Sequence, residues 1–419
     1  MPENSDIGDA PRTRSVYVPD RELTIGQAPP IAANEGLSYL SFDRGGDAGT
    51  EAATEDAISQ AVKGEGRKFM ETLENVSGPI ETKWGKGFKR YSQCLEYIES
   101  TNMAVPEGGV ALPLPYTVDE FPSYSIVPSN QLWNDPSRKD DSKILRKEEY
   151  DAGRRRLYFP KVLRDARRIE EYHPGISPYT SLSMDKLGIA LAHCDSECKN
   201  FYDPSEVEGV FYPEMEKLLL KFFPGASDAL VFNHDIFDKD YEGDCTEDQE
   251  KKNPGVNTNY ANLVHNDLND NSGRVRCREL LTQNLRNFGR TQSYSVSEVE
   301  AKMSARFMSI NLAKPMETVE QNPFVLCAWP SFSEQPYITN YRVYDDRVGE
   351  TTRFTHRSEH DWYWLPQQGS TEISMLKCYD SVLDGSVSRW SFHTACIDPT
   401  ALPEARCRKN IVVRSYVFF

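Results

Sequence analysis

From residue 307 onward the chain is a succession of short segments rich in Val, Ile, Phe, Tyr and Trp, separated by Pro, Gly, Asn and Asp. Residues of the first kind favour strands, and those of the second kind favour turns. No long helical pattern interrupts the series. The sequence therefore predicts an antiparallel sandwich or barrel rather than a parallel α/β sheet. The seven predicted strands cover residues 307–312, 324–329, 337–344, 361–365, 373–379, 390–396 and 411–419.

Helical spacing of apolar residues is clearest upstream of this region. Over residues 207–222 they recur every three to four positions, and Pro224 with Gly225 ends the run. We expect an amphipathic helix there, followed by a strand at 229–232. Shorter helices are expected near 66–75 and 88–100.

Three regions follow from these patterns. Residues 1–35 are polar and proline-rich, which predicts a disordered arm. Residues 36–180 are expected to form a helical or mixed region packed on the core, in which the charged stretch 135–156 is a solvated face. Residues 181–419 are expected to form the β-rich core.

Composition excludes several classes of partner. The net charge of −16 repels nucleic-acid phosphates and anionic lipids. No apolar run approaches the ~20 residues that span a membrane. The first residues lack a basic start followed by an apolar stretch, and the nine cysteines are scattered, so we expect a cytoplasmic, reducing location. We expect a small-molecule substrate and no nucleic-acid or membrane partner, and the sequence predicts no particular oligomeric state.

Two His-x-Asp triplets are candidates for chemistry, His193-Cys194-Asp195 and His265-Asn266-Asp267. With 7 histidines and 64 acidic residues in the chain, chance alone places an acid two positions after a histidine about once. Context must therefore choose between them.

Context favours His265 and Asp267. Side chains two residues apart on an extended segment point to the same side, so both can reach one metal ion. A second histidine must come from a distant strand, and His393 lies in a predicted one. Two histidines and one carboxylate, with positions left open, are the ligands of non-heme iron oxygenases.

His193 fits less well, because it ends a short alternating strand, and no arginine-led strand follows its possible partner histidines at a suitable distance. A zinc site of His193, Cys194 and Cys198 would need a further ligand pair that the sequence does not offer.

The C-terminal strand offers arginines for an anionic cosubstrate. On a strand over residues 408–418, Arg408, Asn410 and Arg414 share one face. Arg408 and Arg414 are about 20 Å apart at ~3.3 Å per residue, so only one can hold a small metal-bound acid. Arg408 is the better candidate, because it is nearer His393 in sequence and a guanidinium grips a carboxylate with two hydrogen bonds. Arg414 is the second candidate, or else a structural salt bridge.

With these residues in view, the chain resembles a fungal family of non-heme iron, 2-oxoglutarate-dependent oxygenases that includes gibberellin desaturase and the hydroxylase/desaturases of secondary-metabolite clusters, with similarity to a cephem methoxylase component. The resemblance implies a mainly β fold with flanking helices and a double-stranded β-helix (jelly-roll, cupin-like) core. It also implies iron on His265, Asp267 and His393, and 2-oxoglutarate on Arg408. Asn410 replaces the hydroxyl residue usual in the family. The fragments that carry the resemblance are residues 211–219, 231–234, 264–267, 311–315, 360–364, 375–381 and 392–395.

The resemblance implies an oxygenase that uses Fe(II), 2-oxoglutarate and O2 to oxidise an unactivated C–H bond of a small molecule, a secondary-metabolite precursor or an amino acid. Hydroxylation, desaturation and oxidative cyclisation are equally open. Alternatives are an iron oxidase that does not use 2-oxoglutarate and a non-catalytic β-barrel binding protein. Tyr341, Trp362 and Trp390 are candidates for a substrate pocket, although aromatics on strands often belong to a core.

Overall fold

A computed structural model describes residues 78–118, 123–126, 156–241, 256–257, 259–282, 294–343 and 348–419. The predicted arm over residues 1–35, the helix expected near 66–75 and nearly all of the charged stretch 135–156 lie outside the described residues.

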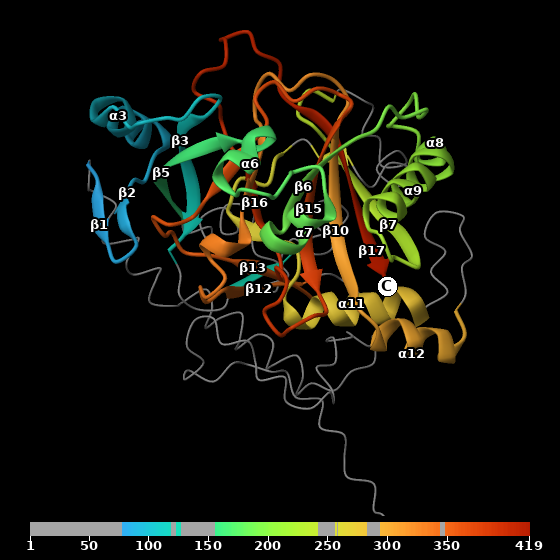
Figure 1. The fold of residues 1–419 in the computed structure, drawn as a ribbon. Coiled ribbons are helices and arrows are strands. Elements are labelled where there is room, and N and C mark those ends of the chain that lie inside the picture. Colours follow the sequence, from blue (N-terminus) through green and yellow to red (C-terminus); the bar gives the residue numbers. More distant parts are fainter. Residues whose placement is uncertain are drawn as a thin grey trace, which may run out of the picture.

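A six-stranded sheet forms one half of the core (Figure 1). Neighbouring strands run antiparallel, apart from the parallel pair β7 and β8. The order across the sheet is β6 (Ile189–His193), β15 (Glu372–Asp380), β10 (Phe307–Pro315), β17 (Lys409–Phe418), β7 (Asp228–Asp238) and β8 (Val256–Asn257).

The second sheet has nine strands, several of them very short. Two pairs in it are parallel, β14 with β5 and β12 with β4. A separate pair is formed by β1 (Ile80–Thr82) and β2 (Gly85–Gly87). The order across the nine-stranded sheet is β3 (Val110–Thr117), β5 (Arg156–Asp165), β14 (Trp362–Trp364), β11 (Phe324–Cys327), β16 (Phe392–Ala395), β9 (His265–Asn266), β13 (Val348–Arg353), β12 (Ile338–Val343) and β4 (Ser123–Ile126).

The two sheets pack face to face. One buried apolar cluster joins Leu191 and Leu376 of the six-stranded sheet to Leu326 and Tyr363 of the nine-stranded sheet. Successive side chains of a strand point to opposite faces, so the other face of each sheet has its own apolar cluster. Two facing, mainly antiparallel sheets of this kind are a jelly-roll core, as the family resemblance implied.

Helices cover the outer faces and the ends of the sheets (Figure 1). Met215 and Leu219 of α9 pack on β10 and β17, which confirms the helix predicted over residues 207–222. Helices α11 and α12 share a second cluster with the ends of β10, β15 and β17. The helices are α3 (Tyr91–Thr101), α6 (Ile169–Tyr172), α7 (Ser181–Leu187), α8 (Pro204–Glu206), α9 (Tyr212–Phe222), α11 (Asp270–Thr282) and α12 (Val296–Ser304), with the tighter or wider turns η2 (Ala166–Arg168), η3 (Val207–Phe211) and η4 (Trp329–Ser331).

The predicted strands from residue 307 onward are all present, with ends that shift by a few residues. In β17 the predicted alternation holds. Ile411, Val413 and Val417 pack toward α9, whereas Val412 and Arg414 line the space between the sheets. The amphipathic strand thereby gives the inter-sheet space one polar wall.

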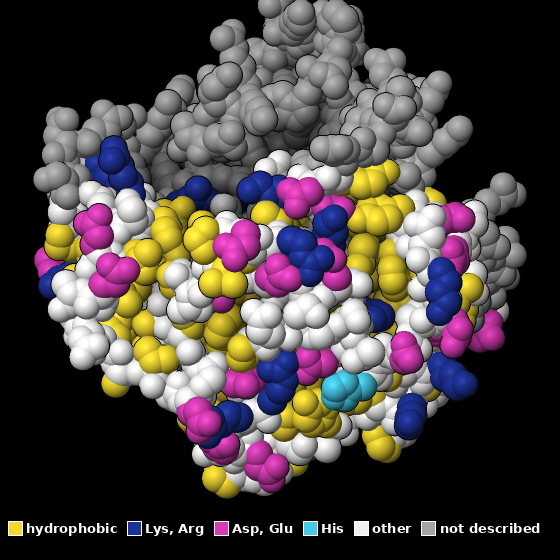
Figure 2. All heavy atoms as spheres, turned by 90° about the horizontal axis from the view of Figure 1, so that it is seen from above, with side chains coloured by type: hydrophobic (Ala, Val, Ile, Leu, Met, Phe, Trp, Pro, Cys, Tyr) yellow, Lys and Arg dark blue, Asp and Glu magenta, His cyan; other side chains and the backbone are white. Residues whose placement is uncertain are grey.

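The surface carries mixed charge. On the face seen in Figure 2, basic side chains lie among acidic ones, and hydrophobic side chains fill the areas between them. Within the described residues, no helix combines the length and apolar character needed to cross a membrane.

Candidate active site

His265 and His393 face each other on paired strands of the nine-stranded sheet. His265 in β9 is the register partner of His393 in β16, and their ring centroids are 4.2 Å apart. Sheet formation thus places two histidines far apart in sequence side by side on the face toward the other sheet.

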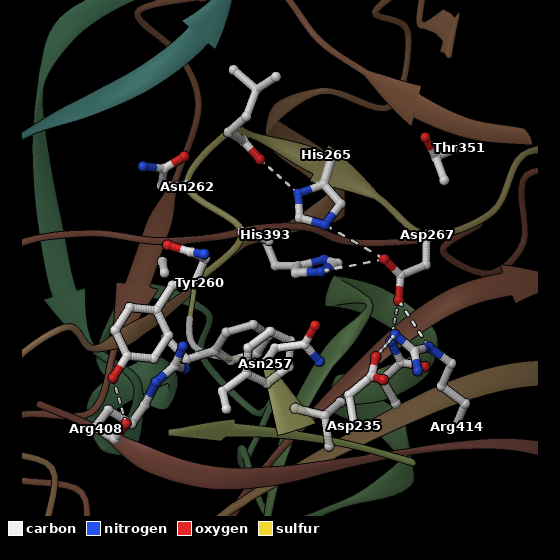
Figure 3. Close-up of a pocket in the computed structure, with 18 of the residues that line it drawn as sticks. Asp235, Asn257, Tyr260, Asn262, His265, Asp267, Thr351, His393, Arg408 and Arg414 are labelled. Carbon is white, nitrogen blue, oxygen red and sulfur yellow. Dashed lines mark hydrogen bonds and ion pairs between the residues drawn. The ribbon is translucent and has the colours of Figure 1, made fainter. Parts of the chain in front are cut away.

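Asp267 completes a three-residue group (Figure 3). Its Oδ1 atom lies 3.5 Å from Nε2 of His265 and 3.8 Å from Nε2 of His393. One ligand atom from each residue lies within 4.8 Å of the others, and no other group of three or more such ligands is found among the described residues. Bonds of ~2.1 Å to one ion would separate adjacent ligands by about 3 Å, so small side-chain shifts suffice. The donor set and its geometry fit a divalent metal ion with open positions.

Both histidines can present Nε2 to a metal ion. Nδ1 of His265 donates a hydrogen bond to the Leu263 carbonyl at 2.6 Å, which leaves the Nε2 lone pair free for a metal. Burial, and next the neighbouring His265, lower the pKa of His393 to about 3. His393 is therefore uncharged at neutral pH, as metal binding requires.

Asp267 is held from the side of the six-stranded sheet. Its Oδ2 atom accepts a hydrogen bond from Nδ2 of Asn311 at 2.7 Å and lies 3.5 Å from Nε of Arg414. Burial alone would raise the pKa of Asp267, but the contact with His265 and the charge of Arg414 hold it well below its usual range. Asp267 is thus a carboxylate with Oδ1 directed at the histidines.

Arg408 is a buried cation without an acidic partner among the described residues. It is 4% exposed, and its guanidinium lies over the rings of Tyr260 and Phe324, at 5.0 and 5.5 Å from their centroids. Its Nε and Nη1 atoms have no hydrogen-bond acceptor there. Burial lowers the pKa of Arg408 to about 10, so it is charged at neutral pH. An unpaired buried charge is costly, and an anionic ligand would relieve that cost.

Asn410 lies two residues further along the same strand face. Its side chain is 1% exposed, and neither its Nδ2 nor its Oδ1 atom has a partner within the described part of the chain. Unsatisfied buried amide atoms are rare in native proteins. Together with Arg408 they fit a bound carboxylate, so the residues present fit 2-oxoglutarate as well as a metal.

A cavity of about 350 Å³ between the sheets joins these groups. Both histidines, Asp267, Arg408 and Arg414 reach it, and Figure 3 shows the arginines on opposite sides of it. Its other walls mix polar and apolar side chains. They are formed by Asp235, Phe237, Asn257, Asn259, Tyr260, Ala261, Asn262, Leu263, Asn311, Phe324, Asn340, Thr351, Arg353, Ala395 and Val412.

Arg414 differs from Arg408 in its partners. Nη1 donates to Oδ1 of Asn233 and Nη2 to Oδ2 of Asp235, each at 2.6 Å. Both partners lie on the neighbouring strand β7. Arg414 therefore forms the salt bridge that was considered from the sequence. Its Nε atom also faces Asp267.

The aromatic residues considered for a substrate pocket lie elsewhere. Trp362 is fully buried in the cluster on the outer face of the nine-stranded sheet, and its Nε1 donates to the Tyr116 hydroxyl at 2.8 Å. Trp390 packs edge-on against Trp329 in the same cluster. Alternation explains this, because Tyr363 and His393 face the inter-sheet space while their neighbours Trp362 and Phe392 face away. Neither tryptophan lines the cavity, and the side chain of Tyr341 lies outside the described residues.

His193 lies at the end of β6, where its ring stacks on Tyr179 at 5.4 Å between centroids. Residues that sequence reasoning missed are Asn311, Asp235 and Tyr260. Asn311 lies within a fragment of the family resemblance and Asp235 directly follows another, so the resemblance could have identified both. Tyr260 had none.

Two facing sheets with a two-histidine, one-carboxylate group between them are the arrangement of a jelly-roll, non-heme iron oxygenase. The chain belongs to the family described as the oxidoreductase/YMDC permease-like domain, whose model matches residues 175–418.

Curated relatives point to the same enzyme class. The chain is 24% identical to the alpha-ketoglutarate-dependent dioxygenase phiK of a fungal species, over 56% of this chain and 79% of the relative. It is 19% identical to the alpha-ketoglutarate-dependent dioxygenase tstK of Talaromyces stipitatus, over 57% and 80%. It is 24% identical to the hydroxylase/desaturase efuI of Hormonema carpetanum, over 57% and 79%.

Among solved structures, the iron and alpha-ketoglutarate-dependent endoperoxidase NvfI matches with a TM-score of 0.54 at 17% identity, over 74% of this chain and 98% of that one. This match bears on the fold. The predicted family resemblance, jelly-roll fold and oxidoreductase class are thus confirmed, and they are favoured over the alternatives. The class implies Fe(II) as cofactor with 2-oxoglutarate and O2 as cosubstrates.

Proposed function

We propose that the protein is an Fe(II)/2-oxoglutarate-dependent oxygenase that oxidises an unactivated C–H bond of a small polar metabolite. One observation carries the proposal: the cavity that holds the three-ligand group also holds a buried arginine with unsatisfied donors. A binding protein would have no physical reason to keep both.

The residue roles follow from the contacts. His265, Asp267 and His393 are the proposed metal ligands, through Nε2, Oδ1 and Nε2. Arg408 is the proposed anchor for the distal carboxylate of 2-oxoglutarate, through the Nε and Nη1 donors that lack a partner. The Asn410 amide would donate to the same carboxylate, in place of a hydroxyl.

Iron bound at this site, with 2-oxoglutarate and O2, supplies the oxidising power to remove a hydrogen atom from an inert carbon. The protein's own contribution is to orient the substrate and to keep a small number of positions open at the metal. Hydroxylation, desaturation and oxidative cyclisation share this first step, and each remains compatible with the site.

The cavity walls bear on the substrate class. Asn257, Asn259, Asn262 and Thr351 line it with amides and a hydroxyl, beside apolar side chains that include Phe237, Leu263 and Val412. Such walls favour a molecule with several hydrogen-bonding groups, such as an amino-acid derivative or a hydroxylated precursor, over a plain hydrocarbon.

A cytoplasmic location is proposed on the state of the cysteines. All eight cysteines in the described residues are free. Free, mostly buried thiols are typical of a reducing compartment.

The test is succinate release by the purified protein supplied with Fe(II), 2-oxoglutarate and O2, with a panel of polar metabolites. We expect Arg408→Gln to raise the KM for 2-oxoglutarate by at least tenfold while iron binding stays intact. The matched control is Arg406→Gln, because Arg406 forms surface ion pairs with Glu317 and Glu320 and does not line the cavity. An oxidase independent of 2-oxoglutarate would leave the Arg408→Gln variant fully active, and a binding protein would purify without iron.

A further inference from the structure

The two oxygens of Asp267 have different surroundings. Oδ1 faces His265 and His393, whereas Oδ2 faces Asn311 and Arg414. Asn311 and Arg414 are register partners on the adjacent strands β10 and β17. One oxygen is therefore oriented by the nine-stranded sheet and the other by the six-stranded sheet.

Asn311 cannot easily move away. Strand β10 is paired on both edges, with β15 and with β17, and every one of its residues is buried. The Asn311 side chain is 2% exposed, and its Nδ2 donates to Oδ2 of Asp267 at 2.7 Å. Losing this bond would leave a buried donor without a partner, which native proteins avoid.

Arg414 is fixed from its far side. Asn233 and Asp235 of β7 hold its two terminal nitrogens at 2.6 Å, so that Nε points at Asp267. The pairing of β17 with β7 is offset by one residue between Arg414 and Ser415. Bulges of this kind re-aim a side chain. Asp235 also forms an ion pair with Arg414, which fixes the direction in which the guanidinium points.

We propose, on the basis of the function proposed above, that Asn311 and Arg414 are positioning residues that hold Asp267 as a one-oxygen ligand, with Asp235 keeping Arg414 in place. With Oδ2 held, Asp267 would offer a metal ion only Oδ1, which would leave positions free for cosubstrate and O2. If Oδ2 were released, the carboxylate could turn and offer both oxygens. In this arrangement Arg414 orients Asp267, and Arg408 is the arginine that remains to bind 2-oxoglutarate.

The test uses Co(II), whose visible absorption reports the number of ligands without turnover. We expect Asn311→Leu and Arg414→Gln each to weaken Co(II) binding by 10- to 100-fold, the usual effect of removing a partner of a metal ligand, and to change the Co(II) spectrum. Asp235→Asn should produce a smaller change in the same direction. Arg406→Gln, on the surface, should bind Co(II) as the unaltered protein does.

Asn311→Ser replaces Asn311→Leu if the leucine variant does not fold. Unchanged Co(II) affinity and spectrum in both the Asn311 and the Arg414 variants would overturn the positioning role. The His265→Ala variant separates this outcome from failure of the proposed function. If His265→Ala loses Co(II) binding while the other variants keep it, the metal centre stands and only the positioning role is wrong. If His265→Ala also binds normally, the metal centre itself is wrong.

Discussion

Arg408 and Arg414 share a strand face but have opposite surroundings. Arg408 lies against two aromatic rings with unsatisfied donors, whereas Arg414 is paired with Asp235 and faces Asp267. A cation with free donors can take up a ligand, and a cation held by acids can only orient what it touches. The difference is made by neighbours from other strands and loops, and the spacing of the two arginines does not reveal it.

Tyr260 should control the affinity for 2-oxoglutarate. Its ring lies under the Arg408 guanidinium, and its hydroxyl donates to the Arg408 carbonyl at 2.5 Å. We expect Tyr260→Ala to raise the KM for 2-oxoglutarate roughly tenfold, because a desolvated cation–π contact contributes about 1–2 kcal/mol. Tyr260→Phe keeps the ring and should show a smaller rise. Steady-state kinetics decide, and an unchanged KM in Tyr260→Ala would count against this role.

His356 should make the fold sensitive to acid. Its ring stacks on Phe159, Nδ1 donates to the Trp84 carbonyl, and Nε2 has no partner among the described residues. Burial, and next the charge of Lys161, lower the pKa of His356 to about 3. Because its folded pKa is below the unfolded value of 6.5, the stability it contributes is present above pH 6.5 and is lost as the pH falls toward 3.

The loss is about 1.4 kcal/mol per pH unit, and it begins only below the unfolded pKa of 6.5. From pH 7 to pH 5 it therefore amounts to about 2 kcal/mol of unfolding free energy. Urea unfolding of the parent protein and of His356→Phe at both pH values measures it. The variant should lose less stability over this interval than the parent. Equal losses would show that His356 does not bind a proton on unfolding in this range.

At the scale of elements, α11 sets the backbone that follows the metal ligands. The helix begins three residues after Asp267, and Gly273 within it packs against Tyr379 of β15. A Cβ atom at Gly273 would lie 2.3 Å from a Tyr379 ring carbon, closer than any real contact. Only glycine lets the helix approach the sheet at this point.

We therefore expect Gly273→Ala to destabilise the fold by about 1–3 kcal/mol, as overpacked cores do, and to weaken Co(II) binding because the segment after Asp267 shifts. Gly209→Ala is the control, since a Cβ atom there meets nothing within 4 Å. Urea unfolding and Co(II) titration measure both effects. A Gly273→Ala variant as stable as the control would mean that β15 and α11 can separate without cost.

The elements that could be predicted were those whose apolar pattern faces a core. β10 and β15 are buried along nearly their whole length, and apolar residues recur at about every second position in both. β13 was missed because Thr351 and Arg353 are polar residues that line the cavity, so the strand shows no apolar alternation to detect. β3 was missed because it contains Pro113 and Pro115, which a strand tolerates only at positions such as this sheet edge.

The candidate site divides in the same way. His265, Asp267 and His393 could be proposed from residue type and spacing, and the structure brings them together. The contact between Asn311 and Asp267 depends on which sheet β10 joins and in which register, and a slip of one residue would turn Asn311 away. Periodicity in the sequence indicates which residues of one strand share a face. It does not indicate which residues of another strand that face contacts.

For the whole molecule, the site joins the two sheets. Both histidines come from the nine-stranded sheet. Asn311 lies in β10 of the six-stranded sheet, and Arg408 directly precedes β17 of the same sheet. Ligands bound between them should therefore stabilise the entire core. A ligand at 100 times its Kd adds about 2.7 kcal/mol, which raises the Tm of a protein of this size by several degrees.

We expect Mn(II) to raise the Tm and 2-oxoglutarate to raise it further once Mn(II) is present, as measured by differential scanning fluorimetry without O2. His393→Ala should lose both increments, because the metal no longer binds and the cosubstrate loses its second attachment. Arg408→Gln should keep the Mn(II) increment and lose most of the second one. If 2-oxoglutarate stabilised His393→Ala as much as the parent protein, the acid would be binding away from the metal, and the two sheets would not be joined through it.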